Sequence, residues 1–224
     1  MKKIILILLM FIASASFYLQ AQTAYGFKVG VGLAKMKFDT PDSSVNSKNT
    51  AAFHIGAVLD LCITPDFYIQ PQLLISRKGT KLDLSSSGFG SLFVIKTSMS
   101  PTYIELPVNL VYKHNFEYGR ILLGAGPYIA YGIGGKIKVN MEFAGSSKDT
   151  TYTIKWGKSL TDDMVPLDYG ASFMAGYEIY NFQFTLNYSR GFASMIPEND
   201  EKIKAMNRVF SVSAAYIFRK KGQK

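Results

Sequence analysis

The chain has 224 residues, 14% of them aromatic, with 19 Gly and 8 Pro. That length fits one all-β domain or a single barrel, since such domains often run to about 200–250 residues. The formal net charge is +9, but the charges are scattered and form no dense basic tract, so we predict no nucleic-acid partner. The single cysteine excludes an internal disulfide.

The first 21 residues have the pattern of a secretory signal peptide. Lys2 and Lys3 precede an apolar run over residues 4–17, and the small residue Ala21 precedes Gln22. A membrane anchor helix is the alternative, but the run is short and ends in polar residues. We expect cleavage after Ala21 and export of the remaining chain, in which no second apolar run reaches the roughly 18 residues of a spanning helix.

Eight runs in the exported part alternate apolar and polar residues with the period of a β-strand. Each has about the 9–11 residues that a tilted strand needs to cross a bilayer. In chain order the runs cover residues 25–34, 53–61, 67–79, 103–113, 121–132, 168–179, 182–191 and 208–218.

The connections between these runs alternate in length. Residues 62–66, 114–119 and 180–181 form short turns, whereas residues 35–51, 79–100, 133–166 and 191–206 form long polar segments. Short turns at one end and long loops at the other are typical of an outer-membrane barrel. Within the third long segment, residues 136–143 and 151–156 alternate around a turn-like stretch. We expect an exposed hairpin that continues the fifth strand, because a ten-strand count would need a further short turn.

Charged side chains decide which face of the strands meets lipid. All the charges assigned to the eight runs fall on the polar face, and aromatic residues gather near the strand ends, where an interfacial girdle is expected. A charge on the lipid face would cost roughly 2–4 kcal/mol at the bilayer midplane. We therefore predict an all-β, eight-stranded antiparallel up-and-down transmembrane barrel with short periplasmic turns, long extracellular loops and its apolar face toward lipid.

An eight-stranded barrel is narrow enough to be filled by its own side chains. We expect a structural polar network in the lumen and no open channel. The predicted members are Lys28, Asp60, Lys78, Glu105, Lys113, Glu178 and Arg190. Pro71, Pro107 and Pro127 each remove a backbone donor from the ladder, and the sequence does not say whether bulges or strand ends accommodate them.

Several of these stretches resemble the PorT-like outer membrane β-barrel family of Bacteroidetes. The matching stretches are FYIQPQLLISRKG (67–79), YIELPVNLVYK (103–113), GAGPYIAYG (124–132), DYGASFMAGYEI (168–179), YSRG (188–191) and Asn207 before RVFSVSAAYIF. The resemblance implies an integral outer membrane protein, often labelled porin-like, without catalytic residues. Some relatives are accessory components of type IX secretion. The domain division is therefore a signal peptide (1–21), a barrel domain (22–220) and a short basic tail (221–224).

The residues predict no enzyme, cofactor or metal site. On this topology His54 and His114 lie at opposite ends of the barrel, so they cannot share a metal. An outer-membrane acylase would need a base beside a rim serine, such as His54 with Ser44 or Ser85. Ordinary rim polarity explains these residues as well.

Three functions remain open: a closed barrel that anchors and displays loops or assists assembly, a narrow solute channel, and a soluble periplasmic lipocalin-like carrier. The expected partners are outer membrane lipid, with lipopolysaccharide phosphates near the basic groups, and a protein bound by the extracellular loops. We favour a monomer. Trp156 and Tyr152, in the predicted hairpin, are possible loop contacts, although packing within the hairpin explains Trp156 equally well.

Overall fold

The computed structural model describes residues 23–39, 47–85, 93–143, 146–159, 161–197 and 204–219. The predicted signal peptide and basic tail lie outside these ranges. Within them no helix is long and apolar enough to span a membrane. The strands are β1 (Thr23–Asp39), β2 (Ser47–Lys48), β3 (Thr50–Cys62), β4 (Phe67–Arg77), β5 (Thr80–Ser85), β6 (Phe93–Phe116), β7 (Gly119–Phe143), β8 (Ser146–Thr153), β9 (Leu167–Ile179), β10 (Phe182–Gly191) and β11 (Lys204–Phe218).

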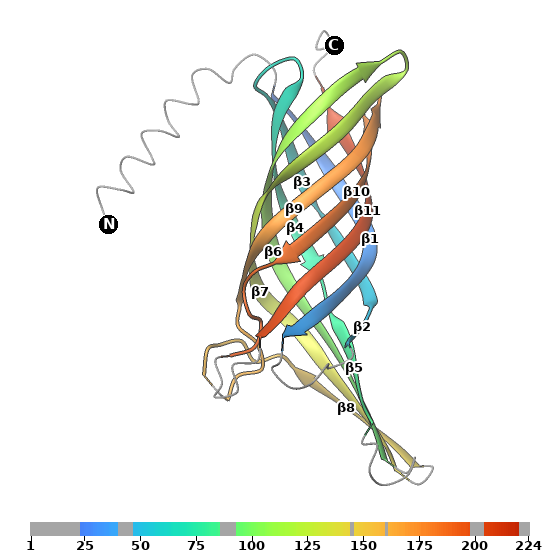
Figure 1. Ribbon diagram of the computed structural model, residues 1–224, viewed down its shortest axis with the longest axis vertical. Helices are drawn as coiled ribbons and strands as arrows, with labels where there is room; N and C mark the ends of the chain where they lie inside the picture. The colour runs from blue at the N-terminus through green and yellow to red at the C-terminus, as the bar shows by residue number, and fades with distance from the viewer. Residues whose placement is uncertain are drawn as a thin grey trace, which may run out of the picture.

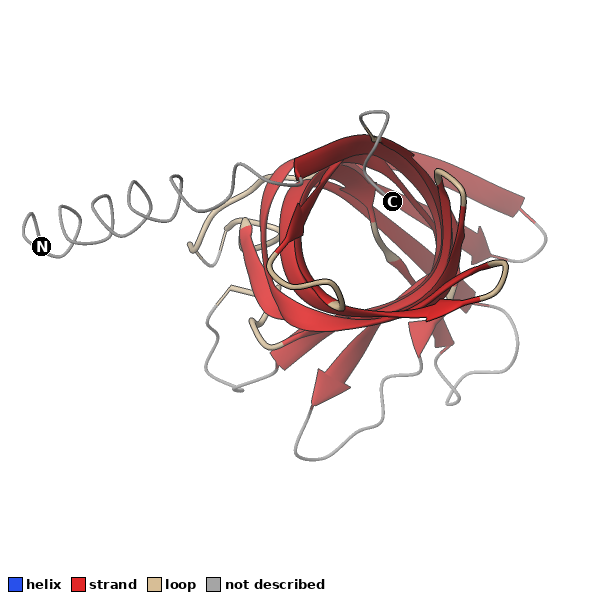
Figure 2. Cartoon of the chain, turned by 90° about the horizontal axis from the view of Figure 1, so that it is seen from above, coloured by secondary structure: helices blue, strands red, loops and turns tan. Residues whose placement is uncertain are grey.

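Eight of these strands close into a ring, as the sequence predicts. The order around the ring is β1–β3–β4–β6–β7–β9–β10–β11, and β11 pairs back with β1 along fifteen residues of antiparallel register, from Tyr25↔Phe218 to Asp39↔Lys204. The view along the barrel shows the closed wall directly (Figure 2). Closure gives every strand of the ring a partner on both sides, so the backbone can satisfy its hydrogen bonds inside a bilayer.

The two ends of the ring differ in length. The short β3–β4, β6–β7 and β9–β10 turns, the start of β1 and the end of β11 lie at one end, which we call the turn end. At the other, the loop end, β6 and β7 continue past the ring and pair with β5 and β8 respectively. This extension of β5, β6, β7 and β8, with the two-residue β2 paired to β5, is the tapering arm in Figure 1. It confirms that a hairpin continues β7, but the second strand is Ser146–Thr153 and not residues 151–156, because Phe143 already pairs with Ser146.

Alternation along each strand separates a lipid-facing from a lumen-facing row. On β1, Tyr25, Phe27, Val29, Val31 and Leu33 are each 50–64% exposed, whereas the positions between them, which are Lys28 and three glycines, face the lumen. The same outward apolar row continues around the ring. Exposed apolar side chains on every wall strand are stable only in an apolar solvent, so the outer wall is the membrane face.

The three prolines are accommodated in a way that the sequence did not predict. Pro71, Pro107 and Pro127 all lie inside strands, and the register on either side of each proline is unchanged. Only a few ladder pairs beside them are missing. The register of the β6–β7 ladder shifts between Thr102 and Tyr103 instead. Neither a register shift nor a strand end therefore accommodates these prolines, and the ladder tolerates the local loss of a donor.

Candidate functional site

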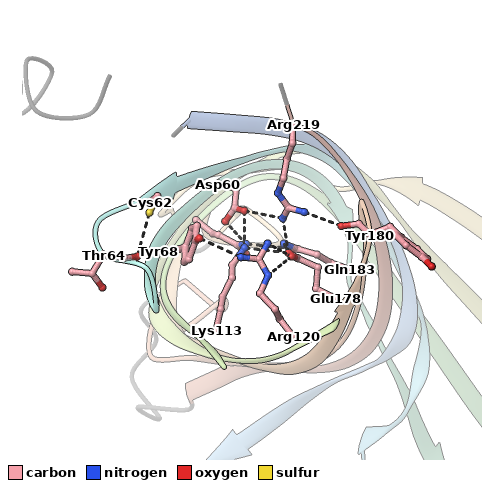
Figure 3. A network of polar contacts seen from close by, with 11 residues as sticks. Asp60, Cys62, Thr64, Tyr68, Lys113, Arg120, Glu178, Tyr180, Gln183 and Arg219 are labelled. Carbon is pink, nitrogen blue, oxygen red and sulfur yellow. Dashed lines mark hydrogen bonds and ion pairs between the residues drawn. The ribbon is translucent and has the colours of Figure 1, made fainter. Parts of the chain in front are cut away.

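The turn end of the lumen is filled by a network of charged side chains, which we call the turn-end network. Lys113 on β6 lies at its centre: its Nζ is 2.6 Å from Asp60 Oδ2 and 3.2 Å from Glu178 Oε2. Arg219 reaches the same two carboxylates from the residue after β11, and Arg120 Nε donates to Glu178 Oε1 at 2.7 Å. Figure 3 shows these side chains converging from opposite walls.

Neutral side chains complete the turn-end network. Gln70 donates to Asp60 Oδ1 at 2.9 Å, and Gln183 donates to Glu178 Oε2 at 2.7 Å. The Tyr68 ring lies under Lys113, with Nζ 4.0 Å from its centroid. Lys113, Asp60 and Glu178 are at most 2% exposed. Such burial is tolerated because each charge has both an opposite charge and further hydrogen bonds.

A second cluster, the loop-end network, lies nearer the extracellular side. Lys78 Nζ contacts Glu105 Oε2 at 2.9 Å and Asp168 Oδ2 at 3.2 Å. Asp168 also accepts from Tyr128 Oη at 3.2 Å and from Asn207 Nδ2 at 2.9 Å. One lysine therefore holds two buried carboxylates that come from β6 and β9, the two strands that flank β7.

Between the two networks lies a belt of mostly neutral polar groups. Lys28 donates to Gln72 Oε1 and Asn187 Oδ1, each at 3.1 Å, so its partners there are amides and not carboxylates. Ser172 donates to Asn109 Oδ1 at 2.5 Å. The belt surrounds a cavity of about 50 Å³. That volume holds a few water molecules and no larger solute.

The loop end of the lumen is covered by an apolar cluster, which we call the plug. Trp156 packs edge-on against Tyr103, with ring centroids 5.5 Å apart. Its ring lies over Gly132, where an added Cβ would overlap the indole, so only glycine leaves room for it. The plug consists of Met36, Tyr103, Tyr128, Ala130, Ile154, Met164 and Met195, with Phe38, Met99, Ile137 and Trp156 packed against them.

The position of Trp156 corrects its assignment as a loop contact. After β8 the chain turns back, and Ile154 and Trp156 pack onto the mouth of the barrel instead of remaining on the hairpin. Trp156 also forms an isolated parallel bridge with Met164. Tyr152, by contrast, stays on β8 and is 55% exposed.

Six of the seven predicted lumen residues are buried inside the barrel, and Arg190 is not. Arg190 is exposed and pairs with Arg208 in the β10–β11 ladder. It has the phase of Tyr188 and Leu186, so the alternation that puts those side chains toward lipid also puts Arg190 outside. The prediction was wrong because the charge of Arg190 was given more weight than its position in the strand.

Sequence reasoning also left out three charged members of the networks. Asp168 has the inward phase of its strand, so alternation could have added it. Arg120 and Arg219 lie at strand ends, where phase is harder to assign from sequence. Both bind carboxylates of the turn-end network.

The histidines lie apart, as predicted, but His54 lines the cavity in the middle of the lumen and not an end of the barrel. His54 Nε2 is 2.9 Å from Ser213 Oγ inside the lumen, whereas His114 stacks on Tyr112 and meets Phe116 edge-on on the outer wall at the turn end. Ser44 and the Ser85 side chain lie outside the described residues. Among the residues that are described, no three metal-binding side chains gather at one place.

Comparison with known proteins agrees with this geometry. Residues 20–196 match the family described as the outer membrane protein beta-barrel domain. The chain belongs to this family. No curated protein matches the chain.

Among solved structures, this outer membrane barrel is similar to OprG from Pseudomonas aeruginosa, at 12% identity and a TM-score of 0.43, over 90% of this chain and 100% of that one. It is also similar to Ail, the attachment invasion locus protein of Yersinia pestis, at 14% identity and a TM-score of 0.36, over 86% and 98% of the two chains. The protein is therefore an integral protein of the outer membrane, on the evidence of its family and its own closed, lipid-facing ring.

Proposed function

We propose that this outer membrane protein is a non-enzymatic anchor that displays its loop-end extension to a partner or assists in assembly, and that it conducts no solute. The observation that supports this proposal is the filled lumen. Two ion-pair networks and an apolar plug are stacked along the barrel, and the belt between them leaves only about 50 Å³. Resemblance to the PorT-like family extends the proposal to a secretion-accessory role.

The proposed partners are of two kinds. Lipopolysaccharide meets the outer wall at the loop end, and a protein binds the extension formed by β5, β6, β7 and β8. One face of that extension carries Met141 and Tyr152, which are 42% and 55% exposed. Exposed apolar side chains at the end of an extracellular arm suit a protein contact. The protein itself is proposed to act as a monomer.

Conductance in planar bilayers tests the closed lumen. The purified protein should give no stable open steps, whereas a narrow solute channel would give them at once. A variant with Lys78→Ala and Glu105→Ala, which removes both members of one ion pair, serves as the comparison. Stable steps from the wild-type protein would contradict the proposal.

Crosslinking in intact outer membranes tests the display role. A partner captured by the wild-type protein should be lost with Met141→Ser/Tyr152→Ser, which changes side chains of the extension without shortening it. The matched control is Tyr180→Ser, because Tyr180 is 86% exposed but lies in a turn at the opposite end. Equal capture by all three proteins would count against the extension as the contact surface.

A further inference from the structure

Three cations lie side by side on the outer wall at the loop end of the barrel. Lys35 on β1 is directly opposite Arg208 on β11, and Arg208 is directly opposite Arg190 on β10. The next residue across, on β9, is Ala171. Within the described ranges none of the three forms an ion pair with a carboxylate. Like charges directly opposite each other in a ladder are destabilising, so this row favours an anion bound from outside.

The row lies directly beyond the membrane-facing apolar surface. One step toward the turn end on the same three strands, the outward side chains are Leu33, Phe210 and Tyr188, also directly paired. They are 52%, 53% and 37% exposed. Two residues of strand span about 6.6 Å, so the wall changes from apolar to cationic within the depth of one lipid headgroup.

Another strand repeats this change at the loop end. Arg77 follows Ile75 on the outward row of β4, so a fourth wall strand also ends its apolar row in a cation. Lys136 and Lys138 are exposed farther out, on the part of β7 that belongs to the extension.

The turn end is different. The outward positions there carry stacked aromatic rings, such as Tyr25 on Phe218 and Phe67 beside Tyr112. In the described part of the chain no lysine or arginine takes an outward strand position at that end. The two membrane boundaries of this barrel are thus chemically distinct, and only the extracellular one is built to meet anions.

We propose that Lys35, Arg208 and Arg190 form a binding site for the phosphate group of an outer-leaflet lipid, with its acyl chains lying on the Leu33–Phe210–Tyr188 row. Two guanidinium groups and an ammonium group suit a phosphate, because arginine binds phosphate oxygens through paired hydrogen bonds. The adjacent apolar row explains why the occupant is a lipid and not a soluble anion. This inference rests on the proposed lipopolysaccharide contact and gives that contact a location.

Binding of defined lipids to the protein purified in zwitterionic detergent tests the site. The probes are diphosphorylated lipid A, dephosphorylated lipid A and inorganic phosphate. The variant is Lys35→Gln/Arg190→Gln/Arg208→Gln. The matched control, Lys148→Gln/Lys155→Gln/Lys158→Gln, removes the same charge from three exposed lysines at the same end of the molecule.

The variant Lys35→Gln/Arg190→Gln/Arg208→Gln, the row variant, should bind diphosphorylated lipid A at least about tenfold more weakly than the wild type, because it loses the charged hydrogen bonds to phosphate that stabilise the complex. The control variant should bind diphosphorylated lipid A as tightly as the wild type does. Dephosphorylated lipid A should bind both proteins weakly. The proposal would be overturned if diphosphorylated lipid A bound the row variant as tightly as the wild type. It would also be overturned if dephosphorylated lipid A bound the wild type as tightly as diphosphorylated lipid A does. Inorganic phosphate that binds as tightly as lipid A would also overturn it, because the site would then serve a soluble anion.

Thermal unfolding provides a second readout that does not depend on the triple variant folding well. In detergent alone, Arg208→Gln should melt at the same temperature as the wild type or higher, because it relieves repulsion in the row. Added diphosphorylated lipid A should raise the melting temperature of the wild type more than that of Arg208→Gln. An equal rise in both would overturn the proposal. None of these outcomes bears on conductance, so the closed-lumen proposal is tested separately.

Discussion

Lys113 and Asp60 are joined by a 2.6 Å ion pair across the interior of the barrel, although their strands β6 and β3 are not neighbours in the wall. The strand between them, β4, contributes Gln70 to the same carboxylate. Glu178 reaches Lys113 from β9 on the other side. Cross-lumen pairs of this kind connect parts of the wall that the backbone ladder does not join, so they determine both the filling and the stability of the lumen.

Lys113→Met should destabilise the barrel by about 3–5 kcal/mol, because it leaves buried carboxylates short of their central cation. Denaturant unfolding in lipid vesicles, followed by the gel mobility of folded and unfolded forms, measures the change. Lys158→Met is the control, since Lys158 is exposed in a loop and should change stability little. Equal stability of the Lys113→Met variant and the wild type would show that the network contributes little.

Fluorescence of Trp156 tests the plug, because it is the single tryptophan of the chain. Its ring packs on Tyr103 over Gly132 at the mouth of the lumen. We expect blue-shifted emission that is quenched weakly both by aqueous acrylamide and by lipids with brominated acyl chains. Gly132→Val should displace the ring, shift its emission to the red and increase acrylamide quenching. Strong quenching of the wild type by brominated lipid would place the indole on the membrane face instead.

Much of the wall could be predicted because a β-strand has a two-residue period and lipid demands an uncharged outer row. The alternation in residues 182–189 therefore predicts both a strand and which of its side chains point toward lipid. The short turns predict which strands are neighbours. The same rule correctly places Lys28 and Glu178 inside. It also places Arg190 outside, and the prediction failed there only because the rule was not applied to the last residues of the strand.

Other features could not be obtained from local patterns. Trp156 continues the alternating pattern of its hairpin, yet tertiary packing draws it onto Tyr103. The partners of Lys78 come from residues 105 and 168, and no local signal in the sequence pairs them. Contacts across the lumen depend on the shear of the closed ring, which sequence alternation does not specify.

A lysine on the membrane face should be far more costly than one on the extension. Val29 lies midway along the outward row of β1 and is 50% exposed, so Val29→Lys should cost roughly 2–4 kcal/mol in a bilayer. Tyr152→Lys introduces the same charge at a 55% exposed site on β8 and should cost little. Denaturant unfolding in vesicles compares the two. A small and equal effect of both substitutions would contradict the orientation of the apolar face.

Cysteine labelling fixes which end of the barrel faces the cell exterior. In a Cys62→Ala background, Tyr118→Cys places a thiol in the β6–β7 turn, where the native side chain is 74% exposed. Lys158→Cys places one in the exposed segment that follows β8. A membrane-impermeant maleimide should label Lys158→Cys in intact cells, and should label Tyr118→Cys only after the outer membrane is permeabilised, because short turns of such barrels face the periplasm. The reverse pattern would invert the topology and move the Lys35–Arg208–Arg190 row to the inner leaflet.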